Sequence, residues 1–171
     1  MENSKLANEV IDQAILRMNE NTPRIEKCLN HLTEEEIWQK PNSSSNSVGN
    51  LMLHLCGNIR QYIISSLGGE EDKRTRKREF TETKSLNKSE LLKKLTDTVH
   101  IACRTIRNLS EEDLLEMRSV QGFNYSGIGN IIHVVEHYSY HTGQIAFWTK
   151  LLKDRDLGFY DGINLNLKNK K

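Results

Sequence analysis

Cysteine and proline are scarce in this sequence, and long apolar runs are missing from it. The three cysteines, Cys28, Cys56 and Cys103, are odd in number and widely spaced, which argues against a disulfide framework. No window holds the ~18 consecutive apolar residues that a membrane-spanning helix needs. The first residues also lack the apolar core of a secretory signal. These absences predict a cytoplasmic protein with no membrane partner.

Net charge is also nearly absent, since 24 lysines and arginines face 23 aspartates and glutamates. A dedicated nucleic-acid-binding protein normally carries a clear basic excess, so we expect no nucleic-acid partner. The charged run over residues 70–79 does not change this expectation, because its five basic residues are balanced by four acidic ones. The run predicts a solvated loop. Trp38 and Trp148 are expected to anchor the core or an interface rather than to stack on bases.

Apolar residues recur every three or four positions over long stretches, which predicts an all-α protein. A first helix is expected over about residues 4–31. Its apolar stripe keeps its phase across Pro23, which indicates one kinked helix, although Thr22-Pro23 could also begin a new one.

Three further helices complete the predicted fold. The second helix begins near Ser47, and the third follows an N-cap at Asn87. The fourth begins at about residue 127 and ends at Lys153. Residues 68–86 lose the periodicity and are expected to form a long crossover between the second and third helices. The pattern predicts a four-helix bundle in a single domain over residues 1–171, with a weakly structured tail from about 155 to 171.

A weak internal repeat supports this architecture. The segment His31–Ile37 parallels Asn108–Leu114, and both have the form of a capping box. The segment Val48–Met52 parallels Ile128–Ile132 at nearly the same separation. The chain therefore resembles two copies of a helical hairpin, although common helix-start chemistry could produce the same match by coincidence.

Six histidines carry the strongest chemical signal, and three of them follow one another at intervals of four residues: His133, His137 and His141. Neighbours at this spacing lie on one helix face and can share a metal ion. The outer two are ~12 Å apart along the helix, so one adjacent pair with a ligand from another helix is expected. His54 is the best third candidate. The alternative is a chance pairing on a polar face.

Two other residues near these histidines are poor candidate ligands. Glu136 is turned about 100° from His137, and Cys56 is turned about 200° from His54, on regular helices. All three cysteines are expected to be small buried apolar residues.

The segments Asn46–Asn58 and Glu136–Ile145 together resemble the DinB superfamily. The similarity extends over essentially the whole chain and includes the stretch Glu35–Pro41. Within the superfamily, the chain is more specifically similar to a DinB-like group described as a domain of unknown function. In that superfamily a four-helix bundle of up-down-down-up order holds a divalent metal ion through three histidines. The resemblance implies three metal ligands: His54, His137 and His141. It makes His133 a neighbour of the metal ion rather than a ligand.

Three imidazole ligands leave at least one coordination position open, which is typical of catalytic metal sites. Characterised relatives in the superfamily include S-transferases that use low-molecular-weight thiols such as bacillithiol, mycothiol or glutathione, and hydrolase-like members. The resemblance therefore implies a metal-dependent thiol S-transferase or hydrolase acting on a small molecule, with zinc or nickel as the expected ion. The alternative is a non-catalytic, metal-containing binding or stress-response module.

Three polar residues are expected near the ion, namely His133, Tyr140 and Gln144. They could orient a substrate, or they could simply line a buried polar seam. No catalytic residue beyond the metal ligands follows from the sequence. The family resemblance also predicts a homodimer, as two-fold pairing is common for amphipathic bundles.

Overall fold

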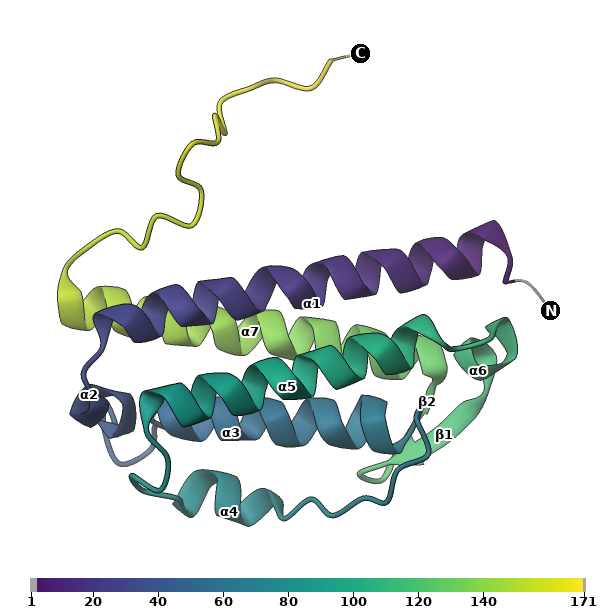
Figure 1. Cartoon of the computed structure of the whole chain (residues 1–171), viewed down its shortest axis with the longest axis horizontal. Helices are drawn as coiled ribbons and strands as arrows, with labels where there is room; N and C mark the ends of the chain where they lie inside the picture. The colour runs from purple at the N-terminus through teal and green to yellow at the C-terminus, as the bar shows by residue number, and fades with distance from the viewer. Residues whose placement is uncertain (1–2, 171) are drawn as a thin grey trace.

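The computed structural model describes residues 3–170 and is mostly helical, with a small two-stranded sheet (Figure 1). The predominance of helix confirms the predicted class, whereas the sheet was not expected from the sequence. In chain order the elements are α1 (Lys5–His31), α2 (Glu34–Trp38), α3 (Val48–Ile59), the π-helix η1 (Arg60–Ser65), α4 (Arg76–Thr81), α5 (Lys88–Arg107), α6 (Glu111–Leu115), β1 (Met117–Val120), β2 (Phe123–Ser126) and α7 (Gly127–Lys153).

The long helices begin and end close to the predicted residues. Helix α1 runs through Pro23 as one element, and α7 matches the predicted limits. The side chain of Ser47 accepts a hydrogen bond from the backbone N–H of Asn50, and Asn87 and Glu90 form the expected capping box at α5. These caps satisfy backbone donors that have no partner inside the helix, which is why local sequence determines the starting points.

The two copies of the internal repeat share their helix-start chemistry. Thr33 with Glu36 and Ser110 with Asp113 both form complete capping boxes, at α2 and α6. Each short helix follows a long one and precedes the entry to the next long one, as the repeat predicts.

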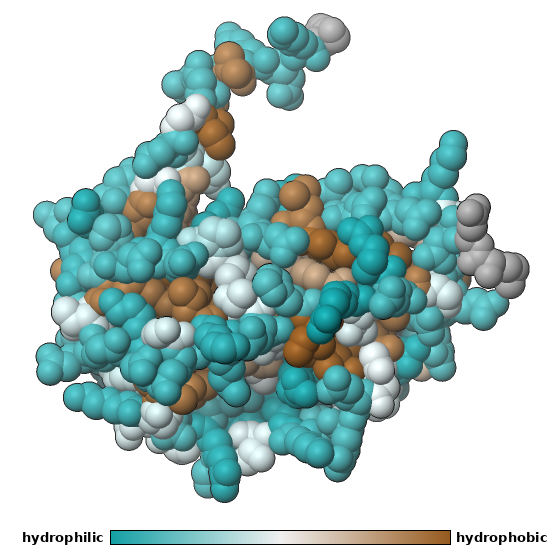
Figure 2. Space-filling view, in the orientation of Figure 1, coloured by the Kyte–Doolittle hydropathy of each residue, from teal (hydrophilic) through white to brown (hydrophobic). Residues whose placement is uncertain are grey.

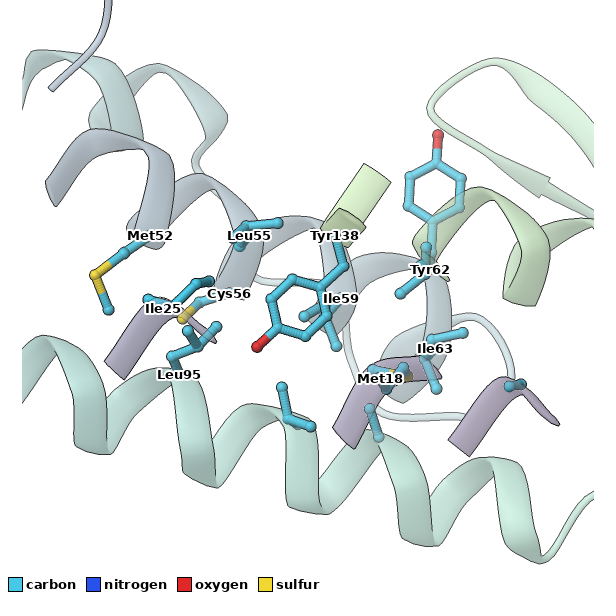
Figure 3. Close-up of a cluster of buried hydrophobic side chains, with 14 of the residues drawn as sticks. Met18, Ile25, Met52, Leu55, Cys56, Ile59, Tyr62, Ile63, Leu95 and Tyr138 are labelled. Atoms are coloured by element: carbon cyan, nitrogen blue, oxygen red, sulfur yellow. The ribbon is translucent and has the colours of Figure 1, made fainter. Parts of the chain in front are cut away.

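Four long helical segments pack side by side around the core. Helix α1 contacts α7 and α5, while α3 contacts α5 and α7. Figure 3 shows the centre of this core, where Tyr138 of α7 lies among aliphatic and sulfur-containing side chains. The hydroxyl groups of Tyr138 and Thr22 are 2.8 Å apart, so the one polar atom of this buried ring has a partner. The packing aligns α3 with α7 and so brings their histidines together.

The predicted crossover is present and most of its charged run is exposed, but it is more ordered than a solvated loop. Helix α4 packs on α3. Within the charged run, Glu79 is buried, and only 4% of the Arg74 side chain is exposed. The Nδ2 atom of Asn50 donates to the backbone oxygens of Glu79 and Glu82 at 3.0 and 2.9 Å, which ties the end of α4 to the start of α3. Helical periodicity cannot reveal such a contact, because α4 has only six residues.

A β-hairpin joins α6 to α7, and the sequence analysis missed it. Strands β1 and β2 pair antiparallel, with Val120 opposite Phe123. The two turn residues between them, Gln121 and Gly122, both have positive φ angles of 54° and 82°, as a tight hairpin turn requires. The strands are only four residues long and carry no clear alternation of buried and exposed residues, which explains why the pattern was not recognised.

Beyond α7 the described part of the tail, residues 154–170, contains no helix or strand and projects from the helices in Figure 1. Leu157 is buried, and Lys27 donates to the backbone oxygen of Gly158, so the first part of this segment returns to the body. Figure 2 shows a largely hydrophilic face with scattered apolar patches. Over residues 3–170, no helix is long and apolar enough to cross a membrane.

Candidate metal centre

Three histidines that the sequence analysis selected converge between α3 and α7. His137 and His141 lie one turn apart on α7, and His54 faces them from α3. One ring nitrogen from each lies within 4.8 Å of the others, so this group could hold a metal ion. Helical spacing brings the first two together, whereas only the packing of α3 on α7 adds the third.

The converging atoms are the Nε2 nitrogens. His54 Nε2 is 2.8 Å from His137 Nε2, and His141 Nε2 is 3.2 Å from His137 Nε2. Two ligand nitrogens of a tetrahedral zinc ion with Zn–N bonds of ~2.0–2.1 Å are ~3.3 Å apart. The imidazoles therefore need only small movements to share one ion, and imidazole suits zinc, nickel, copper and iron.

The Nδ1 atoms of His54 and His141 each contact an oxygen acceptor. These contacts indicate which ring nitrogen presents its lone pair to the centre. His54 Nδ1 is 2.8 Å from Glu79 Oε2, and His141 Nδ1 is 2.6 Å from Gln144 Oε1. A carboxylate and an amide oxygen can only accept, so these contacts favour the tautomer with the proton on Nδ1 in both rings. Arg74 Nη2 also lies 3.1 Å from His54 Nδ1, but it is closer to Glu79 Oε2, at 2.9 Å, and donates there. Both Nε2 atoms are then unprotonated, the form that binds a metal.

Burial favours the uncharged form of His137 and His141. It lowers the pKa of His137 to about 3, and the neighbouring His141 and His54 add to the effect. Burial also lowers the pKa of His141, against the opposing effect of the hydrogen bond that its Nδ1 donates to Gln144. Both rings are therefore neutral near pH 7, so a cation does not have to compete with an imidazolium charge at either of them.

Glu79 and Arg74 are the residues of this site that the sequence analysis missed. Burial disfavours the charged form of Glu79, but hydrogen bonds from Arg74 and His54 outweigh it and lower its pKa. Arg74 Nε donates to Glu79 Oε1 at 2.7 Å and Arg74 Nη2 donates to Oε2 at 2.9 Å. The neighbouring Phe80 packs its ring 4.9 Å from that of His54. In the sequence, the available signal for these two residues was the carboxylate Glu79 at the end of the charged run, directly followed by the aromatic residue Phe80.

The other predicted neighbours lie as follows. His133 is outside the converging group: its Nε2 is 3.1 Å from Asn58 Nδ2, and its ring stacks on Tyr62 with centroids 4.2 Å apart. Tyr140 packs edge-on against His141 but is largely exposed. Of the three expected neighbours, Gln144 is the one that forms a hydrogen bond with a histidine of the centre, His141.

The cysteines do not contribute to the described group. Cys28 and Cys56 are buried and Cys103 is half-buried, and burial raises the pKa of all three thiols to about 11. Such thiols are poor nucleophiles near neutral pH, and none of the three belongs to the converging group. The placement of Cys28 and Cys56 agrees with the predicted role as small buried apolar residues, whereas Cys103 is only partly buried.

Two cavities adjoin the centre through residues that contact its histidines. One of about 420 Å³ lies between α3 and α7, and its wall includes Gln144 and the apolar side chains of Leu51 and Phe147. The other, of about 490 Å³, lies between α3, α4 and α5 and is bounded by Arg74 and Glu79. Both have the size of small-molecule sites.

Comparison with solved structures identifies the fold. A DinB-like protein from Bacillus cereus matches with a TM-score of 0.65 at 15% identity, covering 82% of this chain and 91% of that one. A conserved protein from Enterococcus faecalis matches with a TM-score of 0.63 at 17% identity, covering 91% and 99%. A mycothiol-dependent maleylpyruvate isomerase matches with a TM-score of 0.62 at 14% identity, covering 79% of this chain and 60% of that one.

No curated protein matches the chain. The profile of a family described as a protein of unknown function, DUF1572, matches residues 5–160 and so includes all three converging histidines. The match extends over most of the chain, and the similar structures have a DinB-like fold. The chain thus belongs to the DUF1572 family and has a DinB-like fold.

Proposed function

We propose that the protein is a metal-dependent enzyme that transfers a low-molecular-weight thiol to an electrophilic small molecule. The observation that carries this proposal is the convergence of three unprotonated or readily deprotonated Nε2 nitrogens on one point between α3 and α7. The proposed ligands are His54, His137 and His141, and zinc or nickel is the proposed ion. Similarity in fold to a mycothiol-dependent isomerase supports the choice of a thiol as co-substrate.

The donor set favours a thiol for an electrostatic reason. Three neutral imidazoles contribute no negative charge, so a divalent ion held by them keeps its full charge toward an incoming ligand. When bound, such an ion lowers the pKa of a coordinated thiol so that the nucleophilic thiolate is present at neutral pH. The protein itself supplies neutral ligands and their orienting partners, Glu79 and Gln144.

The electrophilic substrate is proposed to occupy the cavity of about 420 Å³ between α3 and α7. Its apolar walls, formed in part by Leu51 and Phe147, suit the carbon skeleton of a small molecule, while Gln144 links the wall to His141.

The first test is the metal content of purified wild-type protein after dialysis against a weak chelator. The expected result is about one divalent ion per chain. Thiol-dependent consumption of electrophiles is then measured with bacillithiol, mycothiol and glutathione, each compared with a reaction lacking thiol. Activity that requires both metal and thiol supports the proposal. Activity without thiol indicates a hydrolase, and bound metal without any turnover indicates a non-catalytic module.

We further propose that residues 1–171 form one cytoplasmic domain, that the four long helices follow the up-down-down-up order, and that the chain is a homodimer. The described packing of α1, α3, α5 and α7 supports the bundle. Light scattering on the purified protein tests the dimer. A mass near twice 19.8 kDa at micromolar concentration is expected, and a mass near 19.8 kDa would contradict it.

A further inference from the structure

We infer that Glu79, held by Arg74, is a positioning residue for the metal centre: it fixes His54 with its Nε2 lone pair toward the other two histidines. The inference rests on the proposed function, because it assigns a role toward the same ion. It also reassigns the crossover segment, which carries both residues, from a solvated connection to a part of the site.

The fold holds Glu79 against His54 from two sides. Asn50 donates to the backbone oxygens of Glu79 and Glu82, so the last turn of α4 is fixed to the first turn of α3. One turn after His54, Gly57 leaves the space in which the ion pair lies. A Cβ atom at Gly57 would be 2.0 Å from Glu79 Oε1 and 2.9 Å from Arg74 Nε, so only glycine fits beside this pair.

Both carboxylate oxygens are already occupied by donors. Oε2 accepts from His54 Nδ1 at 2.8 Å and from Arg74 Nη2 at 2.9 Å, and Oε1 accepts from Arg74 Nε at 2.7 Å. The carboxylate lies on the Nδ1 side of His54, and it does not belong to the group of converging ligand atoms. Glu79 therefore acts through His54 rather than as a further ligand.

The three histidines differ in this respect. His54 has a carboxylate partner and His141 has an amide partner, whereas no partner is described for Nδ1 of His137. A carboxylate holds the imidazole tautomer and raises the basicity of the coordinating nitrogen, and loss of such a partner commonly costs about 10- to 100-fold in metal affinity. Arg74 balances the buried charge of Glu79 and keeps its two oxygens oriented.

The experiment has a metal-free arm and a metal-binding arm. In metal-free wild-type protein, the ¹⁵N chemical shifts of the histidine rings report which nitrogen of His54 carries the proton. We expect the proton on Nδ1. In the second arm, the Kd for Zn²⁺ is measured by competition with a chromophoric chelator for wild type, Glu79→Gln and the control Glu82→Gln. Glu79→Gln should weaken binding about 10- to 100-fold, and Glu82→Gln should leave the Kd unchanged.

A double variant, Arg74→Gln with Glu79→Gln, separates positioning from charge balance. It leaves no unpaired buried charge, so it folds where the single variant could fail, as circular dichroism would verify. If Glu79 acts by orienting His54, the double variant also binds zinc about 10- to 100-fold more weakly. Recovery of the wild-type Kd in the double variant would overturn the inference.

The two arms distinguish this inference from the proposed function. A wild-type chain that binds no zinc would refute the metal site, while the position of the proton on His54 would still test the role of Glu79. A proton on Nε2 of His54 in the metal-free wild type would refute positioning even if the ion binds.

Discussion

Replacing Gly57 by alanine tests the packing of the crossover on α3, because two physical effects oppose each other at this position. Gly57 lies inside α3, and exchanging glycine for alanine in a helix interior normally stabilises a protein by about 0.5–1 kcal/mol. At this position, however, the added Cβ would lie 2.0 Å from Glu79 Oε1 and 2.8 Å from Glu79 Cδ. The carboxylate must therefore move, and its hydrogen bonds to Arg74 and His54 lengthen.

The expected magnitude follows from the burial of the ion pair. Removing one partner of a buried pair costs about 3–5 kcal/mol, and displacing both partners together costs less. After subtraction of the helix-propensity gain, we expect Gly57→Ala to lower the free energy of unfolding by about 2 kcal/mol. Because His54 loses its fixed partner, the affinity for zinc should also fall.

Gly143→Ala on α7 is the matched control. No heavy atom lies within 4 Å of a Cβ built at Gly143, so only the propensity term acts and a gain of about 0.5–1 kcal/mol is expected. Both variants are compared with wild type by urea denaturation of the metal-free protein, monitored by circular dichroism. If Gly57→Ala were as stabilising as Gly143→Ala, the buried pair would not occupy the space beside Gly57, and the reasoning would be refuted.

Three further predictions follow from the centre and the core. Alanine at any proposed ligand should sharply lower the metal content per chain. The variant His133→Ala should retain most of the metal, and His31→Ala and His100→Ala should retain all of it. A wild-type metal content in His54→Ala would contradict the assignment. In metal-free protein the pKa of His137 is lowered from 6.5 to about 3, so the unfolded chain binds more protons between these values. Stability should therefore decrease as the pH falls below about 6.5 toward 3, and His137→Ala should make the urea midpoint less pH-dependent; an unchanged dependence would exclude this origin. Tyr138→Phe removes the hydroxyl that pairs with Thr22 and should cost about 1 kcal/mol in urea denaturation, with Thr22→Val adding little on that background.

Local sequence determined most of the helices of this protein. The caps at Ser47 and Asn87 and the end of α7 at Lys153 are encoded within a few residues of each boundary, because helix ends need partners for their own backbone groups. The spacing of His137 and His141 likewise determines that the two rings share a helix face. His54 was the best third candidate from the sequence pattern, and the family resemblance then indicated it as the third ligand.

Tertiary structure decided the rest of the centre. Glu79 and Arg74 stand in a charged run whose composition is typical of a solvated loop, and the neighbouring aromatic residue alone does not reveal that both side chains are buried against α3. Their burial depends on Asn50, 29 residues before Glu79, and on the missing side chain at Gly57. A buried carboxylate is stable only where donors meet it from several elements at once, and such donors are brought together by packing rather than by sequence neighbourhood.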